Sequence, residues 1–147
     1  MRILITSLFV LLSISVAQTS YASDGLLNAQ DVMAEIKNSV PKISTEDLKS
    51  LVDSGEDFVL LDVRMPSEIE SMGSIQAEQD IAVARGWLEV QIWNHVIDYD
   101  TRIIPYCGGG IRSAFATKTL GELGFTNVQN YESGLFGWQK AGHPVTQ

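Results

Sequence analysis

The chain has 147 residues, of which 45% are hydrophobic, and it carries a formal net charge of −8 at pH 7. This length and composition are typical of one globular domain with a buried core. The acidic charge argues against nucleic acid and anionic membrane surfaces as partners, because both repel an acidic protein. Any affinity for a small anion must therefore come from a local site. The single cysteine excludes a disulfide within the chain.

Residues 1–22 have the pattern of a secretory signal peptide. Arg2 precedes an uncharged apolar run over residues 3–17, which is shorter than the roughly 20 residues that span a bilayer. Ser20-Tyr21-Ala22 then supplies the small residues of a cleavage site. We expect cleavage after Ala22, with an uncleaved N-terminal anchor as the alternative. Since no later stretch could cross a membrane, no membrane contact is expected after cleavage.

A short amphipathic helix is predicted from Asn28 to Val40. Asn28 is a good N-cap residue, and Pro41 ends the helix because proline cannot continue it. Residues 23–41 are interpreted as an N-terminal helical extension. It either packs on the domain, which we prefer, or serves as a linker or contact surface.

The next predicted elements are a helix and a buried strand. Ser44 with Asp47 forms a capping-box pattern with Asp in place of Glu, and Gly55 ends the helix that follows. The nearly continuous apolar run Phe58–Val63 is typical of a buried parallel strand. Pro66 then marks the first turn of another helix.

The middle of the chain is predicted to contain a short strand around Ile81 and a helix from Arg85 to Ile97. Trp87 and Trp93 are interpreted as core or half-buried packing residues. His95 is solitary, and no histidine or acidic cluster has the spacing of a zinc site, so no metal site is predicted.

A strand from Thr101 to Tyr106 precedes the cysteine. Pro105 lies within it, although proline cannot donate a ladder hydrogen bond and is normally found at sheet edges or bulges. A local bulge that redirects the cysteine is our hypothesis for this position.

Cys107 lies between that strand and a helix predicted from Ser113 to Leu123. Glycines in the connecting loop allow its backbone N–H groups to turn toward the sulfur, and the helix N-terminus adds positive potential. We therefore expect a lowered thiol pKa and a reactive thiolate. The residues predicted to surround the sulfur are Gly108, Gly109, Gly110, Ile111, Arg112 and Ser113.

The last part of the chain is predicted to form a short strand, Val128–Asn130, and a C-terminal segment. Trp138 is interpreted as a core anchor, Gly134 as a residue that supplies backbone freedom near the loop, and His143 as structural.

Three motifs together resemble rhodanese-like sulfurtransferases. The loop Tyr106–Ser113 is similar to their Cys-x-x-Gly-x-Arg-Ser loop, and Leu60–Glu68 is similar to their Asp-Val-Arg-x-x-x-Glu signature. Residues 131–145 resemble their C-terminal Gly-Gly-x-x-x-Trp and Gly-x-Pro-Val signature. The resemblance covers residues 42–147, but it departs from the family over residues 72–81, where the usual histidine is missing.

The resemblance implies an α/β fold with a small parallel sheet of about five strands and helices on both faces. It also implies that Cys107 is the nucleophile that carries a sulfane sulfur as a persulfide. Asp62 and Arg64 would support the site by ion pairing. Arg112 would either add positive charge to the pocket or lock the loop by pairing with an acid such as Asp62, and we prefer the second.

The donor implied is a small sulfur-containing anion such as thiosulfate, a persulfide or a polysulfide, and the acceptor is a nucleophile such as a protein thiol. No cofactor is expected. Gly108, Gly109 and Gly110 carry no cationic side chain that would attract thiosulfate. Their presence therefore favours a persulfide, a polysulfide or a partner protein as the donor. The resemblance to a small bacterial domain without disulfides favours the periplasm over secretion.

Two alternatives remain. One is a sulfur-carrier or protein-binding module with little turnover. The other is a phosphatase or arsenate reductase of the same fold, which uses Cys-x5-Arg; here the spacing is Cys-x4-Arg, with Ser113 where that arginine would fall. The shorter loop disfavours a tetrahedral phosphate, which needs a wider ring of donors.

Overall fold

The computed structural model describes residues 28–146. The predicted signal peptide and its cleavage site lie outside these residues. Within them, no helix is long and apolar enough to cross a membrane.

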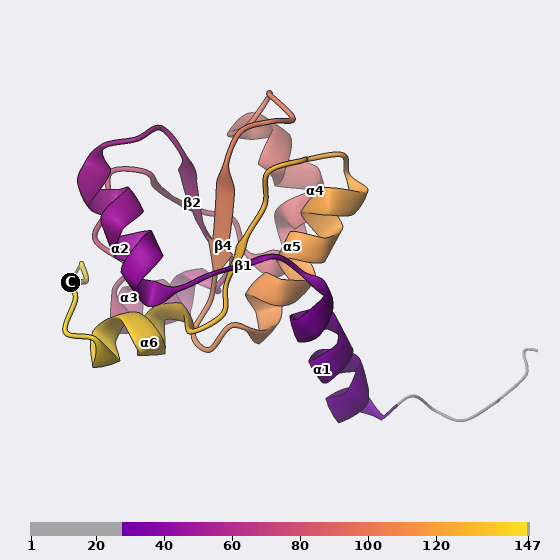
Figure 1. Cartoon of the computed structure of the whole chain (residues 1–147), viewed down its shortest axis with the longest axis horizontal. Coiled ribbons are helices and arrows are strands. Elements are labelled where there is room, and N and C mark those ends of the chain that lie inside the picture. Colours follow the sequence, from indigo (N-terminus) through magenta and orange to yellow (C-terminus); the bar gives the residue numbers. More distant parts are fainter. Residues whose placement is uncertain (1–27, 147) are drawn as a thin grey trace, which may run out of the picture.

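Five parallel strands form the centre of the domain (Figure 1). One piece of sheet has the order β3-β2-β4 and the other pairs β1 with β5. A parallel bridge between Ile103 and Val128 joins the two pieces. The strands are β1 (Lys42–Ile43), β2 (Val59–Asp62), β3 (Asp80–Ala82), β4 (Ile103–Tyr106) and β5 (Asn130–Tyr131). The predicted small parallel sheet is confirmed.

Helices cover both faces of this sheet. In Figure 1, α2, α3 and α6 lie on one side of β2 and β4, and α1, α4 and α5 lie on the other. The helices are α1 (Ala29–Ser39), α2 (Thr45–Ser54), α3 (Pro66–Met72), α4 (Leu88–Gln91), α5 (Ile111–Glu122) and α6 (Gly134–Lys140), with 3-10 turns η1 (Arg85–Trp87) and η2 (Ile92–Asn94). The predicted α/β architecture, with helices on both faces, is therefore correct.

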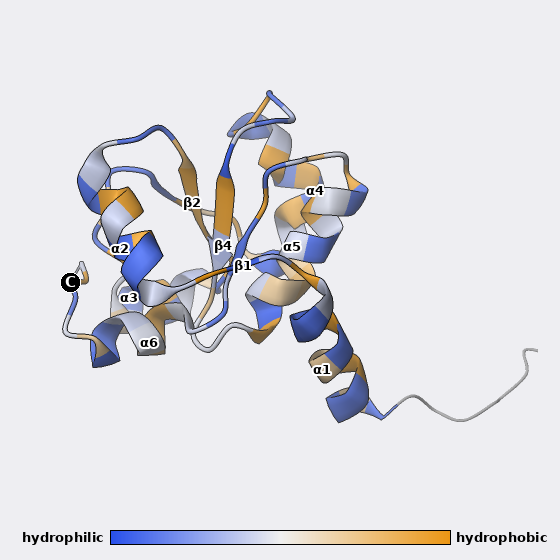
Figure 2. Ribbon diagram, viewed as in Figure 1, coloured by the Kyte–Doolittle hydropathy of each residue, from blue (hydrophilic) through white to orange (hydrophobic). Residues whose placement is uncertain are grey.

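The central strands are buried on both faces because successive side chains enter different cores. Leu61 and Ile103 belong to the core beneath α4 and α5, whereas Leu60 and Ile104 belong to the core beneath α2 and α6. Figure 2 shows β2 and β4 as apolar strands between helices whose outer surfaces are polar. This explains the unbroken apolar run in the sequence, since strict alternation is lost when both faces are covered.

Local sequence signals place several helix ends correctly. The Asn28 side chain accepts a hydrogen bond from the Gln30 N–H, and the Ser44 hydroxyl accepts one from the Asp47 N–H. Gly55 ends α2 in the left-handed conformation, with φ of 70°. The N-terminal helix packs on the domain, because Ile36 and Val40 share a buried cluster with residues of α5.

The segment after β3 differs from the prediction of one continuous helix. Between Arg85 and Asn94 it consists of η1, the single-turn α4 and η2. Leu88 and Ile92 are buried, but Trp87 is 59% exposed, so its assignment as a packing residue is wrong. Trp93 is partly covered by Phe125, on which it stacks with a centroid separation of 5.3 Å.

Pro105 lies in β4 without a bulge, so the bulge hypothesis is wrong. The pairing of β2 with β4 is regular from Val59↔Ile103 to Asp62↔Tyr106. Backbone groups along a strand point alternately to its two neighbours, and Ile103 donates to Asn127 on the β5 side. Pro105, two residues later, faces the same side, beyond the Ile103–Val128 bridge. The missing donor therefore costs no bond to β2.

Candidate active site

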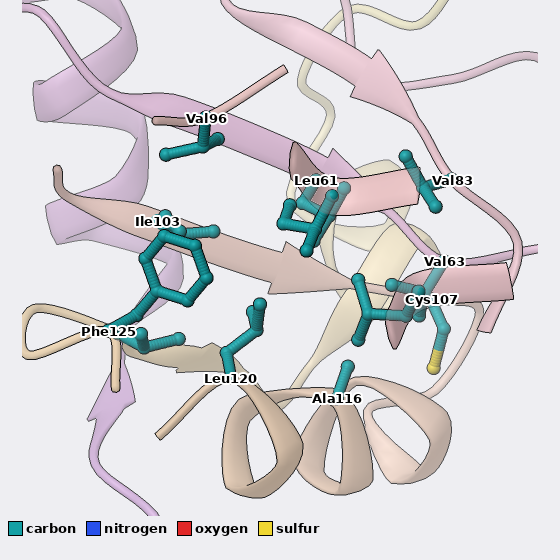
Figure 3. Close-up of a cluster of buried hydrophobic side chains, with 12 residues drawn as sticks. Leu61, Val63, Val83, Val96, Ile103, Cys107, Ala116, Leu120 and Phe125 are labelled. Carbon is teal, nitrogen blue, oxygen red and sulfur yellow. The ribbon is translucent and has the colours of Figure 1, made fainter. Parts of the chain in front are cut away.

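The loop that carries Cys107 connects the carboxyl end of β4 to α5. Gly110 is the N-cap residue of α5, and the helix begins at Ile111, two residues earlier than predicted. Figure 3 shows Cys107 at the edge of a buried apolar cluster, with its sulfur directed toward the first turn of α5. The sulfur thus lies where the N-terminus of a helix favours negative charge.

Cys107 is buried, but polar groups surround its sulfur. The residue is only 2% exposed, the Gly110 N–H donates to Sγ at 3.2 Å, and the Ser113 hydroxyl donates at 3.7 Å. Burial alone raises the pKa of the thiol, but hydrogen bonds from the Ser113 N–H and hydroxyl and from the N–H groups of Gly109 and Gly110 outweigh it. The net effect is a lowered pKa of Cys107, which favours the thiolate.

The loop keeps this shape because another chain segment lies directly against it. A Cβ at Gly110 would lie 1.9 Å from the Glu132 carbonyl oxygen, and a Cβ at Gly134 would lie 2.4 Å from the Cys107 carbonyl oxygen. Both glycines have positive φ, 82° and 59°. The N–H of Leu135 donates to the Cys107 carbonyl at 2.8 Å, so the start of α6 holds the loop from outside.

Arg112 pairs with an acid, as predicted, but the acid is Glu68 rather than Asp62. Its two terminal nitrogens donate to the two Glu68 oxygens at 2.6 and 2.7 Å. This bidentate contact lowers the pKa of Glu68 to about 2 and raises that of Arg112. The charge of Cys107 also contributes to the Arg112 shift. Arg112 therefore both joins α3 to the loop and adds positive charge near the sulfur.

Asp62 and Arg64 form a separate pair within the protein. Both side chains are fully buried, and Arg64 donates to the Asp62 oxygens and, at 2.7 Å, to the Gly73 carbonyl. The pairing agrees with the predicted supporting role. The Arg64 guanidinium is enclosed and already bound to a carboxylate, so it is not available to bind a substrate anion.

The six residues predicted to surround the sulfur have different contacts. The Gly110 N–H and the Ser113 hydroxyl donate hydrogen bonds to it, and the Gly109 N–H contributes to the lowered pKa of Cys107. Gly108 instead lies against the Phe136 ring, and Ile111 is partly exposed at the start of α5.

Three residues at the site were not selected from the sequence. Glu68 was included only as part of the Asp62–Glu68 motif, although it lies two residues after Pro66 and is therefore the first-turn acid of α3. Asn130 is buried and donates from Nδ2 to the Gly110 carbonyl at 3.4 Å. Phe136, next to the glycine loop, carries no local signal that distinguishes it from a core residue.

Metal ligation has no support within the described part of the chain. Over residues 28–146, no three His, Cys, Asp or Glu side chains form a group that could hold an ion. His143 packs on the Trp138 ring, with a centroid separation of 4.6 Å, as expected of a structural residue.

Comparisons with known proteins agree with this geometry. The Rhodanese-like domain family model matches residues 44–141. A sulfurtransferase of Allochromatium vinosum is 29% identical over 106 residues, which are 72% of this chain and 94% of that protein. YrkF of Bacillus subtilis, whose name describes a sulfur carrier, is 32% identical over 105 residues; these are 71% of this chain but only 54% of that protein.

A solved structure shows the same fold. The polysulfide-sulfur transferase homodimer of Wolinella succinogenes superposes with a TM-score of 0.71 at 29% identity. The match covers 80% of this chain and 85% of that one. The chain therefore belongs to the rhodanese-like domain family, whose members compared here include sulfurtransferases and a sulfur carrier.

Proposed function

We propose that this protein is an exported rhodanese-type sulfurtransferase in which Cys107 carries the transferred sulfur. The observation that supports this most directly is that the Gly110 N–H and the Ser113 hydroxyl both donate hydrogen bonds to one buried sulfur at the start of α5. A thiolate is the nucleophilic form of cysteine, and fixed N–H donors stabilise the negative charge that remains after the transfer.

The proposed reaction has two steps. The Cys107 thiolate attacks the outer sulfur of a donor; with thiosulfate, the S–S bond breaks and sulfite leaves with the bonding electrons. The added sulfur remains as a persulfide anion held by the loop N–H groups. A nucleophilic acceptor then attacks that sulfur, and the Cys107 thiolate is restored as the leaving group.

A sulfur carrier with little turnover is the second candidate. It is favoured by the burial of Cys107, because a residue that is only 2% exposed is poorly accessible to an acceptor that must reach the sulfur in every turnover. Phosphatase or arsenate reductase chemistry is disfavoured for two reasons. The donors of Gly110 and Ser113 are directed at the single sulfur atom of Cys107, and the Arg112 guanidinium is already bound to the Glu68 carboxylate.

Intact mass spectrometry separates these candidates. The protein beginning at residue 23 is incubated with thiosulfate, an inorganic polysulfide or an organic persulfide, and Cys107→Ala is the control. A sulfurtransferase gains the mass of one sulfur on Cys107 and then releases it to cyanide or a thiol over many turnovers. A carrier gains the sulfur but shows negligible thiosulfate:cyanide turnover. If no donor adds sulfur, the proposal is wrong.

The periplasm remains the proposed location. Expression of the full chain in a Gram-negative bacterium, followed by fractionation and N-terminal sequencing, should give a periplasmic protein beginning at Ser23. A cytoplasmic protein that retains Met1 would contradict this.

A further inference from the structure

The outer face of the Cys107 loop carries an exposed aromatic ring. Phe136 is 54% exposed, although it belongs to α6, whose neighbouring residues Leu135 and Trp138 are fully buried. Its N–H donates to the Gly108 carbonyl at 3.0 Å, which fixes its backbone to the loop. Its ring carbons lie 3.1 Å from the place where a Cβ at Gly108 would be. Any side chain at position 108 would meet this ring.

The cations at this loop are already paired. Arg112 is held by Glu68 in a bidentate contact, and Lys42 binds Glu132, whose carbonyl borders Gly110, at 3.0 Å. Arg64, whose guanidinium lies over the Tyr106 ring at 5.7 Å from its centroid, is likewise paired, with Asp62. The outer side of the loop therefore combines an apolar ring with cations that are each paired with a carboxylate.

From these two observations we propose that Phe136 is a specificity-determining residue that selects organic persulfides with an apolar carbon chain over inorganic thiosulfate. The inference rests on the proposed sulfur transfer to Cys107. A thiosulfate dianion must lose hydration beside an apolar ring and beside cations that are already bound to carboxylates, which is costly. An organic persulfide carries at most one charge, on the sulfur that the loop N–H groups receive, and its carbon chain can cover the Phe136 ring.

The transfer step is balanced without another reactant. The Cys107 thiolate attacks the terminal sulfur of R–S–SH, and the bond between the two donor sulfurs breaks. The thiolate R–S⁻ leaves with the bonding electrons, and the proton stays on the transferred sulfur. The carbon chain of this thiolate passes the Phe136 ring as the product leaves.

The test is a chain-length series of donors. Methyl, propyl and pentyl persulfides are compared with thiosulfate, and the second-order rate constant for sulfur loading on Cys107 is measured by quenched intact mass. Each methylene that gains apolar contact should raise the rate constant by roughly two- to fourfold in the wild-type protein. In Phe136→Ala this dependence should vanish, so that the ratio of the rate constant for pentyl persulfide to that for thiosulfate falls.

Two further variants separate specificity from folding. Phe136→Leu keeps an apolar side chain and should retain the chain-length dependence, whereas Phe136→Gln should lose it at similar size. Ile97→Ala is the matched control, because Ile97 is an exposed apolar residue in the segment leading to the opposite end of β4. Thermal melts confirm that each variant is folded, and the Leu and Gln pair supplies the comparison if the alanine variant is not.

Two results would overturn the inference: a wild-type rate that does not depend on chain length, or a dependence that survives in both Phe136→Ala and Phe136→Gln. Absence of loading from every donor is a different result, since it refutes the sulfur transfer on which the inference rests.

Discussion

Removing the Ser113 hydroxyl should raise the pKa of the Cys107 thiol. The hydroxyl donates to Sγ at 3.7 Å, and it is one of four contacts that lower this pKa. The N–H of Ser113 also lowers this pKa, and it remains in Ser113→Ala. The substitution therefore tests the hydroxyl without disturbing the backbone.

The size of the effect follows from the geometry. A hydrogen bond to a charged group contributes about 1.5–3 kcal/mol, but this one is long for an oxygen donor and is shared with three N–H contacts. We expect a loss of about 0.7–1.4 kcal/mol, which corresponds to a rise of roughly 0.5–1 pKa unit. Sulfur loading near neutral pH should slow by a factor of about 3–10, because less thiolate is present.

The assay is a titration of thiolate absorbance in the ultraviolet, corrected with Cys107→Ser for tyrosine ionisation. Thr117→Ala is the matched control. Thr117 is a buried hydroxyl residue of the same helix, but it donates to the Ser113 carbonyl rather than to the sulfur. An unchanged or lowered thiol pKa in Ser113→Ala, or an equal rise in Thr117→Ala, would show that the hydroxyl does not stabilise the thiolate.

Three further perturbations test the surrounding structure. Burial raises the pKa of Asp80 to about 7, so the folded state holds a proton that the unfolded state has lost, and stability falls as pH rises from about 4 to 7. Asp80→Asn should remove this dependence. In urea titrations, its free energy of unfolding should increase by about 2–4 kcal/mol relative to that of the wild type between pH 4 and 8. The same dependence on pH in both proteins would contradict this. Arg64→Ala leaves its buried carboxylate partner unpaired and should cost about 3–5 kcal/mol by the same measurement, whereas a loss below about 1 kcal/mol would mean that water replaces the pair. Gly134→Ala places a Cβ 2.4 Å from the Cys107 carbonyl oxygen and should abolish sulfur loading, whereas Gly55→Ala, with a similar φ but nothing within 4 Å, should retain it.

The central strands, the helix caps and the cysteine loop were predictable because short-range physical chemistry determines them, whereas the two-residue strand β1 (Lys42–Ile43) was not predicted. Asn28, Ser44 and Gly55 act within a few residues of their own positions, so a local pattern is sufficient. The Cys107 loop was also predictable, because the glycines, the helix start and the sulfur are adjacent in the chain.

The partners of charged and aromatic residues were less predictable because they depend on distant segments. Asp62 and Glu68 are both acids near the end of β2, and the sequence does not show which one faces Arg112. Trp87 fits a helical pattern, but the chain breaks into 3-10 turns there and leaves the ring in solvent. The contact of Phe136 with Gly108 joins residues 28 positions apart and exists only after α6 docks.

Pro105 lies on the side of β4 that faces β5, where the two strands share few hydrogen bonds. Hydrogen bonding between β4 and β5 is confined to the neighbourhood of Ile103, and β5 then pairs with β1 instead. Pro105 follows two residues later on the same side of β4, where its missing N–H breaks none of the recorded hydrogen bonds, and the pairing with β2 continues through it. The strand that carries the cysteine therefore tolerates a proline directly before Tyr106 without losing its place at the centre of the sheet.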